Sequence, residues 1–431
     1  MLKTIFLSFC CLSFSLFNIY AQTYLSYFSG DTADIITTPQ KGVCLMGGAG
    51  EDDNAMKWFL QRAAGGDILV LRTDDSDGYQ DYLFSDLGID VNSVETIVCN
   101  SADASTDAYV LQQIKNAEAL WFAGGDQWNY VSYWRDTPVE DAINEVVNVK
   151  GITIGGISAG MAIQGQVVFT AENGSITSFQ ALSNPYSTLL TLAYDDFIEN
   201  PVMEKIITDT HFDDPDRRGR TTTFLARILN DYGFKGYAIA CNEYNAVCID
   251  ENKIAHCYGE YPEYEDHVYF IQINCIEPSA PEKIVSGDQL DWRRNNAALK
   301  VLKMNSTTDG TSTLDLNDWQ TVSGGYSWEN WWVEEGIFKF EEETSPLDCD
   351  VAIEQTYQQS FECFPNPVKD KLMLSGLQHP IHISIKDLSG NILINSFSND
   401  GIIDVHFLTN GLYMITCEGE NYFQSQLFCK Q

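Results

Sequence analysis

Basic residues are scarce in this sequence. Its 431 residues include 25 Lys and Arg against 61 Asp and Glu, which gives a formal net charge of −36. Nucleic acids and anionic membranes attract proteins through basic surface, so neither is expected as a partner. The surplus of carboxylates is typical of a soluble, acidic exterior, and it could also attract a cationic substrate.

Long apolar runs are missing after residue 21. No later stretch approaches the roughly 18 apolar residues of a membrane helix, so we expect no integral membrane segment. Residues 1–21 combine a positive start at Lys3, an apolar run from Thr4 to Phe17 and a small residue, Ala21, at the end. This is the pattern of a cleaved secretory signal peptide, so we expect an exported protein.

The twelve cysteines include no C-x-x-C pair, which argues against a zinc site. The acidic segment 73–78 does not fit a calcium loop, because Phe84 stands where the twelfth ligand would be, and we expect no metal. Cys10 and Cys11 lie in the signal segment, which leaves ten cysteines. An even number in an exported protein permits disulfides, but buried free thiols are an equal alternative.

From about residue 40 to residue 300, short apolar stretches alternate with amphipathic ones. This pattern predicts an α/β fold with a mostly parallel sheet and helices on both faces, as in flavodoxin-like proteins. Sites in such sheets lie beyond the carboxyl ends of the strands. Gly-Gly pairs end three of the expected strands, at 47–48, 124–125 and 155–156, and predict one crevice. The expected strands are 43–46, 67–71, 95–99, 119–122 and 152–154, and the expected helices are 54–64, 107–117 and 139–149.

The amino-acid composition of the sequence changes after residue 300. Residues 301–345 begin with a stretch rich in Ser, Thr, Asp and Gly and continue into a cluster of four tryptophans. Such a cluster can bind sugar rings, but it more often forms a core or a covering flap, so we expect it to pack on the preceding domain. The cluster comprises Trp319, Trp328, Trp331 and Trp332.

The end of the chain has the pattern of a small all-β domain. Short alternating strands are separated by turns at 389–390, 399–401 and 410–411. The expected organisation is a signal peptide (1–21), an α/β domain (22–300), the Trp-rich extension (301–345), a linker (346–360) and a β-sandwich (361–431).

Ser158 stands in the most informative motif. The β-branched run 152–154 stops at a Gly-Gly pair, and Ser158 follows within GISAG at 156–160. A G-x-S-x-G pattern at a strand-to-helix turn is typical of an exposed nucleophile, because small neighbours permit the sharp turn and leave the serine accessible. The alternative is a Gly-rich turn that only packs a helix on the sheet.

A serine nucleophile needs a base and an acid that orients the base. His211 ends a strand-like run, where the crevice is expected, whereas His256 and His267 lie in polar surroundings. Glu243 follows the strand-like run 237–241, and from position alone it is one candidate acid among many. His211 is therefore the expected base.

Backbone N–H groups at Gly-rich turns are the expected oxyanion donors. Gly125 and Asp126, in the turn after 119–122, fit that role together with the amide of Ala159. A cluster of arginines after His211 could hold a substrate carboxylate through the guanidinium fork, or could pair with the aspartates beside it. These residues are Arg217, Arg218 and Arg220, with Asp213, Asp214 and Asp216.

Two other functions fit Ser158. An α/β-hydrolase esterase orders its triad as Ser, acid and His, and it would take its base from His256 or His267. A surface-binding protein with a degenerate site would carry the same motif without reactivity. Labelling by a fluorophosphonate separates the second alternative from an enzyme.

Taken together, five segments resemble the serine peptidase family of cyanophycinase and dipeptidase E. The resemblance covers about residues 40–290 and implies a class I glutamine amidotransferase-like fold, with Ser in place of the amidotransferase Cys and no cofactor. In the family's order, the segments are GGAG at 47–50, FAGGDQ at 122–127, GGISAG at 155–160, DTHFDDPDRRGR at 209–220 and ACNEYNAV at 240–247.

The resemblance implies a role for each candidate residue. Ser158 is expected as the nucleophile, His211 as the base and Glu243 as the orienting acid. Substrate contacts are expected from Gln127 and Arg217, with Arg220 as a further candidate.

This chain departs from the cyanophycinase pattern at two positions. Cyanophycinases commonly carry Gln where this chain has Thr210, and Arg where it has Pro215. The expected grip on a β-linked aspartyl-arginine unit is therefore incomplete. We expect a secreted serine peptidase that cleaves short or acidic peptides through an acyl-enzyme, with β-aspartyl-arginine as one candidate substrate. Its oligomeric state stays open.

The C-terminal domain is similar to the type IX secretion sorting domains of Bacteroidetes. The residues that carry this similarity are FPNPV at 364–368, IKDLSG at 385–390 and GLY at 411–413. The resemblance implies that the type IX secretion machinery is a partner, that the chain crosses the outer membrane, and that the domain is then removed or the chain attached to the surface. A plain adhesive β-sandwich is the alternative.

Overall fold

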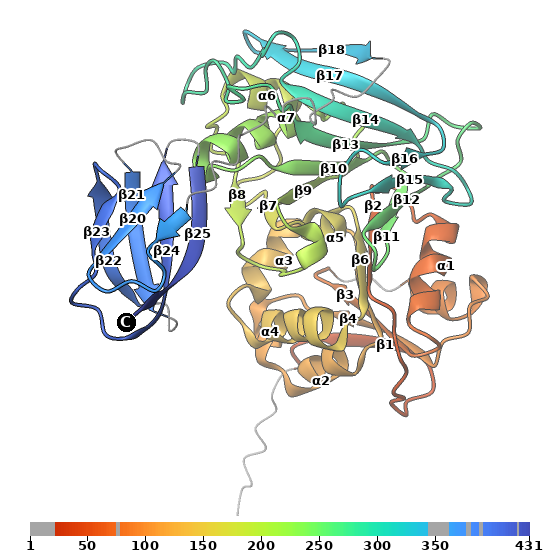
Figure 1. Ribbon diagram of the computed structural model, residues 1–431. Coiled ribbons are helices and arrows are strands. Elements are labelled where there is room, and N and C mark those ends of the chain that lie inside the picture. The colour runs from red at the N-terminus through yellow and green to blue at the C-terminus, as the bar shows by residue number, and fades with distance from the viewer. Residues whose placement is uncertain (1–21, 75–77, 344–361, 376–380, 388–390, 420–421) are drawn as a thin grey trace, which may run out of the picture. The chain divides into compact units, whose positions relative to one another are not determined.

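Figure 1 shows the computed structural model, which describes residues 22–74, 78–343, 362–375, 381–387, 391–419 and 422–431. The chain forms two compact units, residues 1–347 and 348–431. The expected signal peptide (1–21) and linker (346–360) lie outside the described residues. Among the helices that are described, none is long and apolar enough to cross a membrane.

A ten-stranded sheet carries the first part of the larger unit. Five neighbouring strands run parallel in the order β4-β3-β5-β6-β2, and β1 adds antiparallel to β4 at one edge. Four strands in antiparallel pairing, β11-β12-β15-β16, continue beyond β2. The bounds are β1 Leu25–Gly30, β2 Gly42–Met46, β3 Asp67–Arg72, β4 Ser93–Val98, β5 Ala119–Phe122, β6 Thr153–Ile157, β11 Ala246–Ile249, β12 Ile254–Tyr258, β15 Ser312–Asp315 and β16 Val322–Ser323.

Helices cover both faces of this sheet, which confirms the predicted α/β class (Figure 1). Side chains alternate along each strand, so Leu69 and Leu71 of β3 share a core with α2, α3 and α4. Ile68 and Val70 share a core with α1 on the opposite face. The bounds are α1 Asp53–Arg62, α2 Ala108–Asn116, α3 Gln127–Trp134 and α4 Pro138–Glu145.

Short polar residues fix where these helices begin. The side chains of Asp52, Asp107 and Asp126 each accept a hydrogen bond from a first-turn N–H group, at α1, α2 and α3 respectively. Helix α4 starts with Pro138, which has no N–H group to leave unsatisfied. The chain therefore leaves each strand and enters the next helix at a defined residue.

The structure adds a second sheet that the alternating pattern does not predict. Its order is β18-β17-β14-β13-β10-β9-β7-β8, and only β10, β9 and β7 pair in parallel. Antiparallel neighbours need no crossover helix, so the helix-strand alternation stops here. Helices α5 Ala159–Ala162, α6 Ser178–Ser183 and α7 Arg218–Arg227 accompany the strands β7 Val167–Phe169, β8 Leu192–Tyr194, β9 Ile206–Asp209, β10 Tyr237–Cys241, β13 His267–Ile273, β14 Leu299–Asn305, β17 Tyr326–Glu334 and β18 Ile337–Glu343.

The tryptophans of the Trp-rich extension lie in the core. Trp331 is fully buried, and the other three are at most 8% exposed. Trp319 stacks on Tyr237 with ring centroids 4.3 Å apart, and the indole N–H of Trp331 donates to Glu329 at 2.6 Å. Because these rings face other protein groups, they form packing surface and leave no platform for a sugar ring.

Among the described residues, the cysteines comprise one that is disulfide-bonded and a set of free thiols. Cys275 is disulfide-bonded. Cys44 and Cys248 lie opposite each other on β2 and β11 with their sulfur atoms 3.6 Å apart, and both are buried. The described free thiols are Cys44, Cys99, Cys241, Cys248, Cys257, Cys363, Cys417 and Cys429.

The smaller unit is all-β, as the sequence predicts. A three-stranded and a four-stranded sheet share one apolar core that includes Val368, Leu372, Ile385 and Ile415. The three-stranded sheet contains β19 Glu362–Phe364, β20 Lys371–Ser375 and β23 Ile402–Asp404. The four-stranded sheet contains β21 Ile381–Asp387, β22 Ile392–Ser398, β24 Gly411–Gly419 and β25 Tyr422–Lys430.

Candidate active site

Ser158 lies at a sharp turn between β6 and the short helix α5. Its backbone has φ 53° and ψ −114°, outside the regions that non-glycine residues normally occupy. A Cβ on Gly160 would lie 2.0 Å from the carbonyl oxygen of Phe122, and one on Gly156 would lie 2.5 Å from Gly160. Only glycines therefore let α5 pack so closely on the sheet. The turn leaves Ser158 partly exposed at the carboxyl edge of the strands.

The turn after β2 fastens the three chain segments that carry the expected Ser, His and Glu. Three successive carbonyl groups, from the last residue of β2 into this turn, each accept a backbone N–H group from a different one of these segments. Since the donors and acceptors are all main-chain groups, backbone geometry sets the spacing of the segments. The pairs are Ser158 N–H to Met46 O (3.0 Å), His211 N–H to Gly47 O (2.9 Å) and Tyr244 N–H to Gly48 O (3.0 Å).

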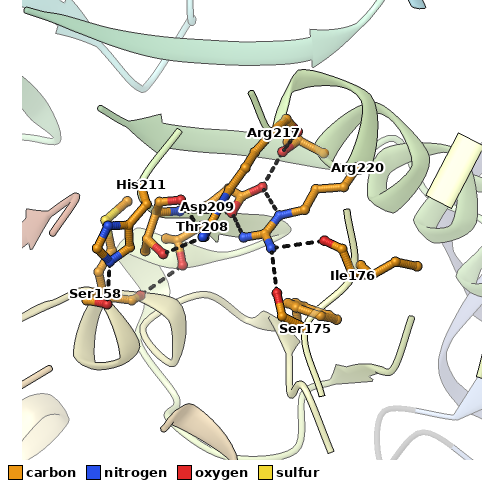
Figure 2. A network of polar contacts seen from close by, with 12 residues as sticks. Ser158, Ser175, Ile176, Thr208, Asp209, His211, Arg217 and Arg220 are labelled. Atoms are coloured by element: carbon orange, nitrogen blue, oxygen red, sulfur yellow. Dashed lines mark hydrogen bonds and ion pairs between the residues drawn. The ribbon is translucent and has the colours of Figure 1, made fainter. Parts of the chain in front are cut away.

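Ser158, His211 and Glu243 lie in one continuous line of side-chain hydrogen bonds. Oγ of Ser158 is 2.8 Å from Nε2 of His211, and Nδ1 of His211 is 2.6 Å from Oε1 of Glu243. A carboxylate beside Nδ1 favours the tautomer that leaves Nε2 free to accept a proton. Figure 2 shows the imidazole of His211 directed at the hydroxyl of Ser158. The structure thus brings together the three residues that the sequence singles out.

A buried ion pair supports the strand end that leads to His211 (Figure 2). Asp209, the last residue of β9, and Arg220 of α7 have side chains that are 2% and 4% exposed. Nε of Arg220 donates to the Asp209 carboxylate at 3.1 Å, and Nη2 donates to its other oxygen. The amide of Thr210 and the hydroxyl of Thr221 donate to the same carboxylate. This network holds the chain two residues before the imidazole.

Arg220 is therefore not placed as the substrate contact that the sequence led us to expect. Its Nη1 donates to Ser175 Oγ and Ile176 O, both at 3.3 Å, so every nitrogen of the guanidinium is engaged. The group also lies over the rings of Phe169 and Phe224. Helix α7 turns this arginine into the core, and the sequence spacing gave no sign of that direction.

Arg217 is partly exposed, unlike Arg220. Its Nη1 donates to the carbonyl oxygen of Thr210 at 2.8 Å, next to His211 in the chain. Burial and the neighbouring Arg220 lower the pKa of Arg217 to about 10. The side chain remains a cation at neutral pH and can face an anionic group.

The expected oxyanion turn lies beside Ser158. A Cβ on Gly124 would lie 3.7 Å from Cβ of Ser158, which puts the turn at 124–126 next to the nucleophile. Gly125 is exposed and has φ 151°, a conformation that favours glycine. Ala159 is the first residue of α5, and the first N–H groups of a helix have no acceptor within the helix. The N–H group of Ala159 therefore has no acceptor within α5, and the role of both amides stays a prediction.

Asp126 and Gln127 begin helix α3 beside this turn. The carboxylate of Asp126 accepts the N–H of Trp128 at 2.9 Å, so its side chain works as a helix cap. Nε2 of Gln127 donates to the carbonyl oxygen of Phe169 at 3.4 Å, a long contact that a ligand could replace. Gln127 is partly exposed.

The other two histidines of the α/β domain lie elsewhere. Nδ1 of His256 faces the carbonyl oxygen of Gly310 at 3.2 Å, and Nε2 of His267 faces Glu265 at 3.2 Å. Burial lowers the pKa of His267. Neither histidine pairs with Ser158, as the esterase alternative would require. Within the described chain, no group of three His, Cys, Asp or Glu side chains could hold a metal ion.

Two side chains that the sequence did not single out hold the segment of Glu243. The carboxylate of Asp213 accepts the Glu243 N–H at 3.0 Å. The amide of Asn245 donates to the Glu243 carbonyl oxygen at 2.8 Å. Asp213 lies two residues after His211, so it links the two segments. Its position among several aspartates hid this role in the sequence.

Gly48 is a sensitive position, because a Cβ there would lie 2.3 Å from Cε1 of His211. We expect Gly48→Ala to displace the imidazole and lower kcat/KM about 100-fold while the fold persists, since misplacement by about 1 Å costs that much. Steady-state kinetics and circular dichroism measure both effects. Gly78→Ala is the matched control, because Gly78 has a similar φ of 126° but nothing within 4 Å. Equal losses in both variants would assign the effect to backbone strain and contradict this prediction.

Comparisons with known proteins find two family matches in this chain. Residues 75–255 match the model of peptidase family S51, and residues 362–431 match that of the secretion system C-terminal sorting domain. A cyanophycinase from Geminocystis herdmanii (strain PCC 6308) is 23% identical over 196 residues, which are 43% of this chain and 68% of that protein.

Two solved structures are similar over about half of this chain. A peptidase from an acI-B1 Actinobacterium is 14% identical over 52% of this chain and 89% of its own, with a TM-score of 0.37. A putative peptidase E protein from Listeria monocytogenes EGD-e is 13% identical over 51% of this chain and 99% of its own, with a TM-score of 0.33.

The matched families define this chain as a peptidase, and therefore a hydrolase. Residues 75–255 match peptidase family S51, to which the cyanophycinase and dipeptidase E resemblance also points. Its C-terminal sorting domain indicates export through the type IX secretion system to the cell surface or the extracellular space.

Proposed function

We propose that this protein is a serine peptidase that cleaves short or acidic peptides outside the cell. The observation that carries the proposal is the line of hydrogen bonds from Ser158 through His211 to Glu243. The strained turn at Ser158 and the match to peptidase family S51 support it. The position of His211, before Glu243 in the chain, favours a peptidase over an esterase with a later histidine.

In the proposed mechanism, Oγ of Ser158 attacks the carbonyl carbon while its proton passes to Nε2 of His211. The amides of Gly125 and Ala159 bind the oxyanion, and Glu243 stabilises the imidazolium. The imidazolium then gives its proton to the leaving amine, and the C–N bond breaks to leave an acyl-enzyme. Water attacks this ester with His211 as the base, which releases the acid and restores Ser158.

We assign the remaining candidates by their surroundings. Gln127 and Arg217 are proposed to contact substrate, since both are partly exposed, with the side chain of Gln127 bonded to Phe169 at 3.4 Å and that of Arg217 bonded to Thr210. A cation at Arg217 suits a substrate carboxylate, and this favours acidic peptides. Arg220 is proposed to act through Asp209, as a support for the segment of His211. β-Aspartyl-arginine, the unit of cyanophycin, remains one candidate substrate.

A peptide library tests this proposal. We expect the exported chain to release amines from some α- or β-linked aspartyl dipeptides and to form a fluorophosphonate adduct at Ser158, detected by mass spectrometry. Cleavage confined to internal α-linked sites of longer peptides would remove β-aspartyl-arginine as the candidate. Folded protein that forms no adduct and cleaves no peptide would contradict the whole proposal.

A further inference from the structure

Two buried cysteines face each other across neighbouring strands of the ten-stranded sheet. Cys44 of β2 and Cys248 of β11 are directly opposite in the antiparallel register, and neither has any exposed surface. Side chains of opposite residues leave the sheet on the same face, and both cysteines belong to the core that lies between the sheet and α1. Their sulfur atoms are 3.6 Å apart. The two thiols are therefore in direct contact.

The two strands already have the spacing that a disulfide needs. Opposite residues of an antiparallel pair have Cα atoms about 4.5 or 5.5 Å apart, and disulfides form at Cα distances of about 4.4–6.8 Å. Bonded sulfur atoms are about 2.05 Å apart, so the sulfur atoms of Cys44 and Cys248 must approach by about 1.5 Å. Rotation about the two Cα–Cβ bonds shares this movement between both side chains, and neither strand has to shift.

The thiols lose little when they give up their hydrogen atoms. The sulfur atoms of Cys44 and Cys248 lie 4.0 and 3.9 Å from the carbonyl oxygen of Ala55 in α1, which are long distances for a hydrogen bond from a weak donor. Burial raises the pKa of Cys248 well above its usual value, and the thiolate is the reactive form in disulfide exchange. Exchange is therefore favoured before α1 covers the strands, and a bond formed by then is protected from external thiols.

The exported chain meets the conditions in which disulfides persist. Its C-terminal sorting domain indicates export, and Cys275 is disulfide-bonded. Disulfides are stable outside the cytosol, where no thiol pool reduces them. Burial of a cysteine is not sufficient by itself, because Cys257 of β12 is equally buried but lies opposite Val247 and Ser312. The placement of two cysteines at opposite positions is what distinguishes the pair on β2 and β11.

We propose that Cys44 and Cys248 are joined by a disulfide in the exported protein. The oxidant is a disulfide-bearing molecule outside the cytosol. The thiolate of one cysteine attacks this disulfide, forms a mixed disulfide and displaces one thiol. The thiolate of the second cysteine then attacks the sulfur atom of the first and displaces the other thiol. Two cysteine thiols are oxidised to one disulfide, and the disulfide of the oxidant is reduced to two thiols.

This bond ties together two strands that meet at the candidate active site. Cys44 is two residues before Met46, whose carbonyl group accepts the N–H of Ser158. Cys248 is four residues after Tyr244, whose N–H donates to the same turn. The two cysteines are 204 residues apart in the chain, and closing a long loop strongly restricts the unfolded state. The cross-link is independent of the proposed catalysis, and it would be present in a protein with no peptidase activity.

Mass spectrometry of the exported chain tests this bond directly. The protein is unfolded in an alkylating agent, which blocks free thiols, and is digested without reduction by trypsin and a glutamate-specific protease. The peptides 42–51 and 244–251 then hold one cysteine each. We expect to find them linked, and to find them separate after reduction. Recovery of both as alkylated thiols, or of either one joined to a different cysteine, overturns the proposal.

Urea unfolding followed by tryptophan fluorescence measures what the bond does. A reducing agent should lower the midpoint of the exported chain by about 1 M, because the unfolded chain is no longer restricted. Cys248→Ala should remove most of this shift. Cys257→Ala, an equally buried change on the neighbouring strand, is the matched control and should keep it. Reduction breaks the bond of Cys275 in both variants, so the difference between them reports the proposed bond, and equal shifts in both contradict it.

Discussion

Ser158→Ala is expected to lower kcat for peptide hydrolysis by about 10⁴- to 10⁶-fold, the largest effect of any single change in this chain. The hydroxyl supplies the attacking oxygen, and no other side chain lies 2.8 Å from Nε2 of His211 among those described. Glu243→Gln should cost about 10⁴-fold, because an amide no longer fixes the tautomer of His211. Initial rates with the best peptide from the library measure both losses.

Two control variants test whether the loss of kcat is specific to the candidate triad. Ser132→Ala removes an exposed hydroxyl from α3, and Glu265→Gln alters the acid that faces His267, so both should leave kcat within about twofold. A loss of fluorophosphonate labelling in a His256 or His267 variant, with labelling intact in His211→Asn, would falsify the assignment of the base. That pattern would support the esterase alternative instead.

Asp209→Asn is expected to destabilise the larger unit by about 3–5 kcal/mol, because it leaves the guanidinium of Arg220 buried without its charge partner. The same change loosens the segment that leads to His211, so kcat/KM should fall even in the protein that remains folded. Urea unfolding followed by tryptophan fluorescence reports the larger unit, because the buried tryptophans at 319, 328, 331 and 332 lie there.

Asp216→Asn provides the control for this prediction. Asp216 also pairs with an arginine, Arg218, but its side chain is 52% exposed, and surface ion pairs contribute about 0–1 kcal/mol. We therefore expect a small shift in its urea midpoint. If Asp209→Asn shifts the midpoint no more than Asp216→Asn does, the buried pair is not the support that its geometry indicates.

The features that could be predicted from the sequence are those that depend on residues close together in the chain. The small residues around Ser158 predict the turn between a strand and a helix, and the turn is there. The alternation of short apolar and amphipathic stretches predicts a parallel sheet with helices on both faces, which holds for β2 to β6. Both patterns depend on neighbours within about ten residues.

What could not be read depends on contacts between distant segments. The second sheet consists largely of antiparallel pairs such as β13 with β14. The periodicity of the sequence does not indicate which strands pair. Arg220 was expected to hold a substrate carboxylate or to pair with the aspartates beside it in the chain, yet its partner is Asp209 at the end of β9. The direction in which a side chain leaves a helix decides between these outcomes, and spacing alone does not reveal the helix's orientation.

The three carbonyl groups at the end of β2 make catalytic activity depend on the integrity of the sheet around that strand. They take N–H groups from segments that are far apart in the chain, so the candidate triad exists only when β2 is docked between β6 and β11. If separate loops held the three residues, each residue could be displaced independently. Because one turn holds all three segments, the arrangement of the three side chains is lost in one step. Inactivation by heat or urea should therefore coincide with the separation of β2 from β6 and β11. Loss of activity then reports the unfolding of this part of the sheet.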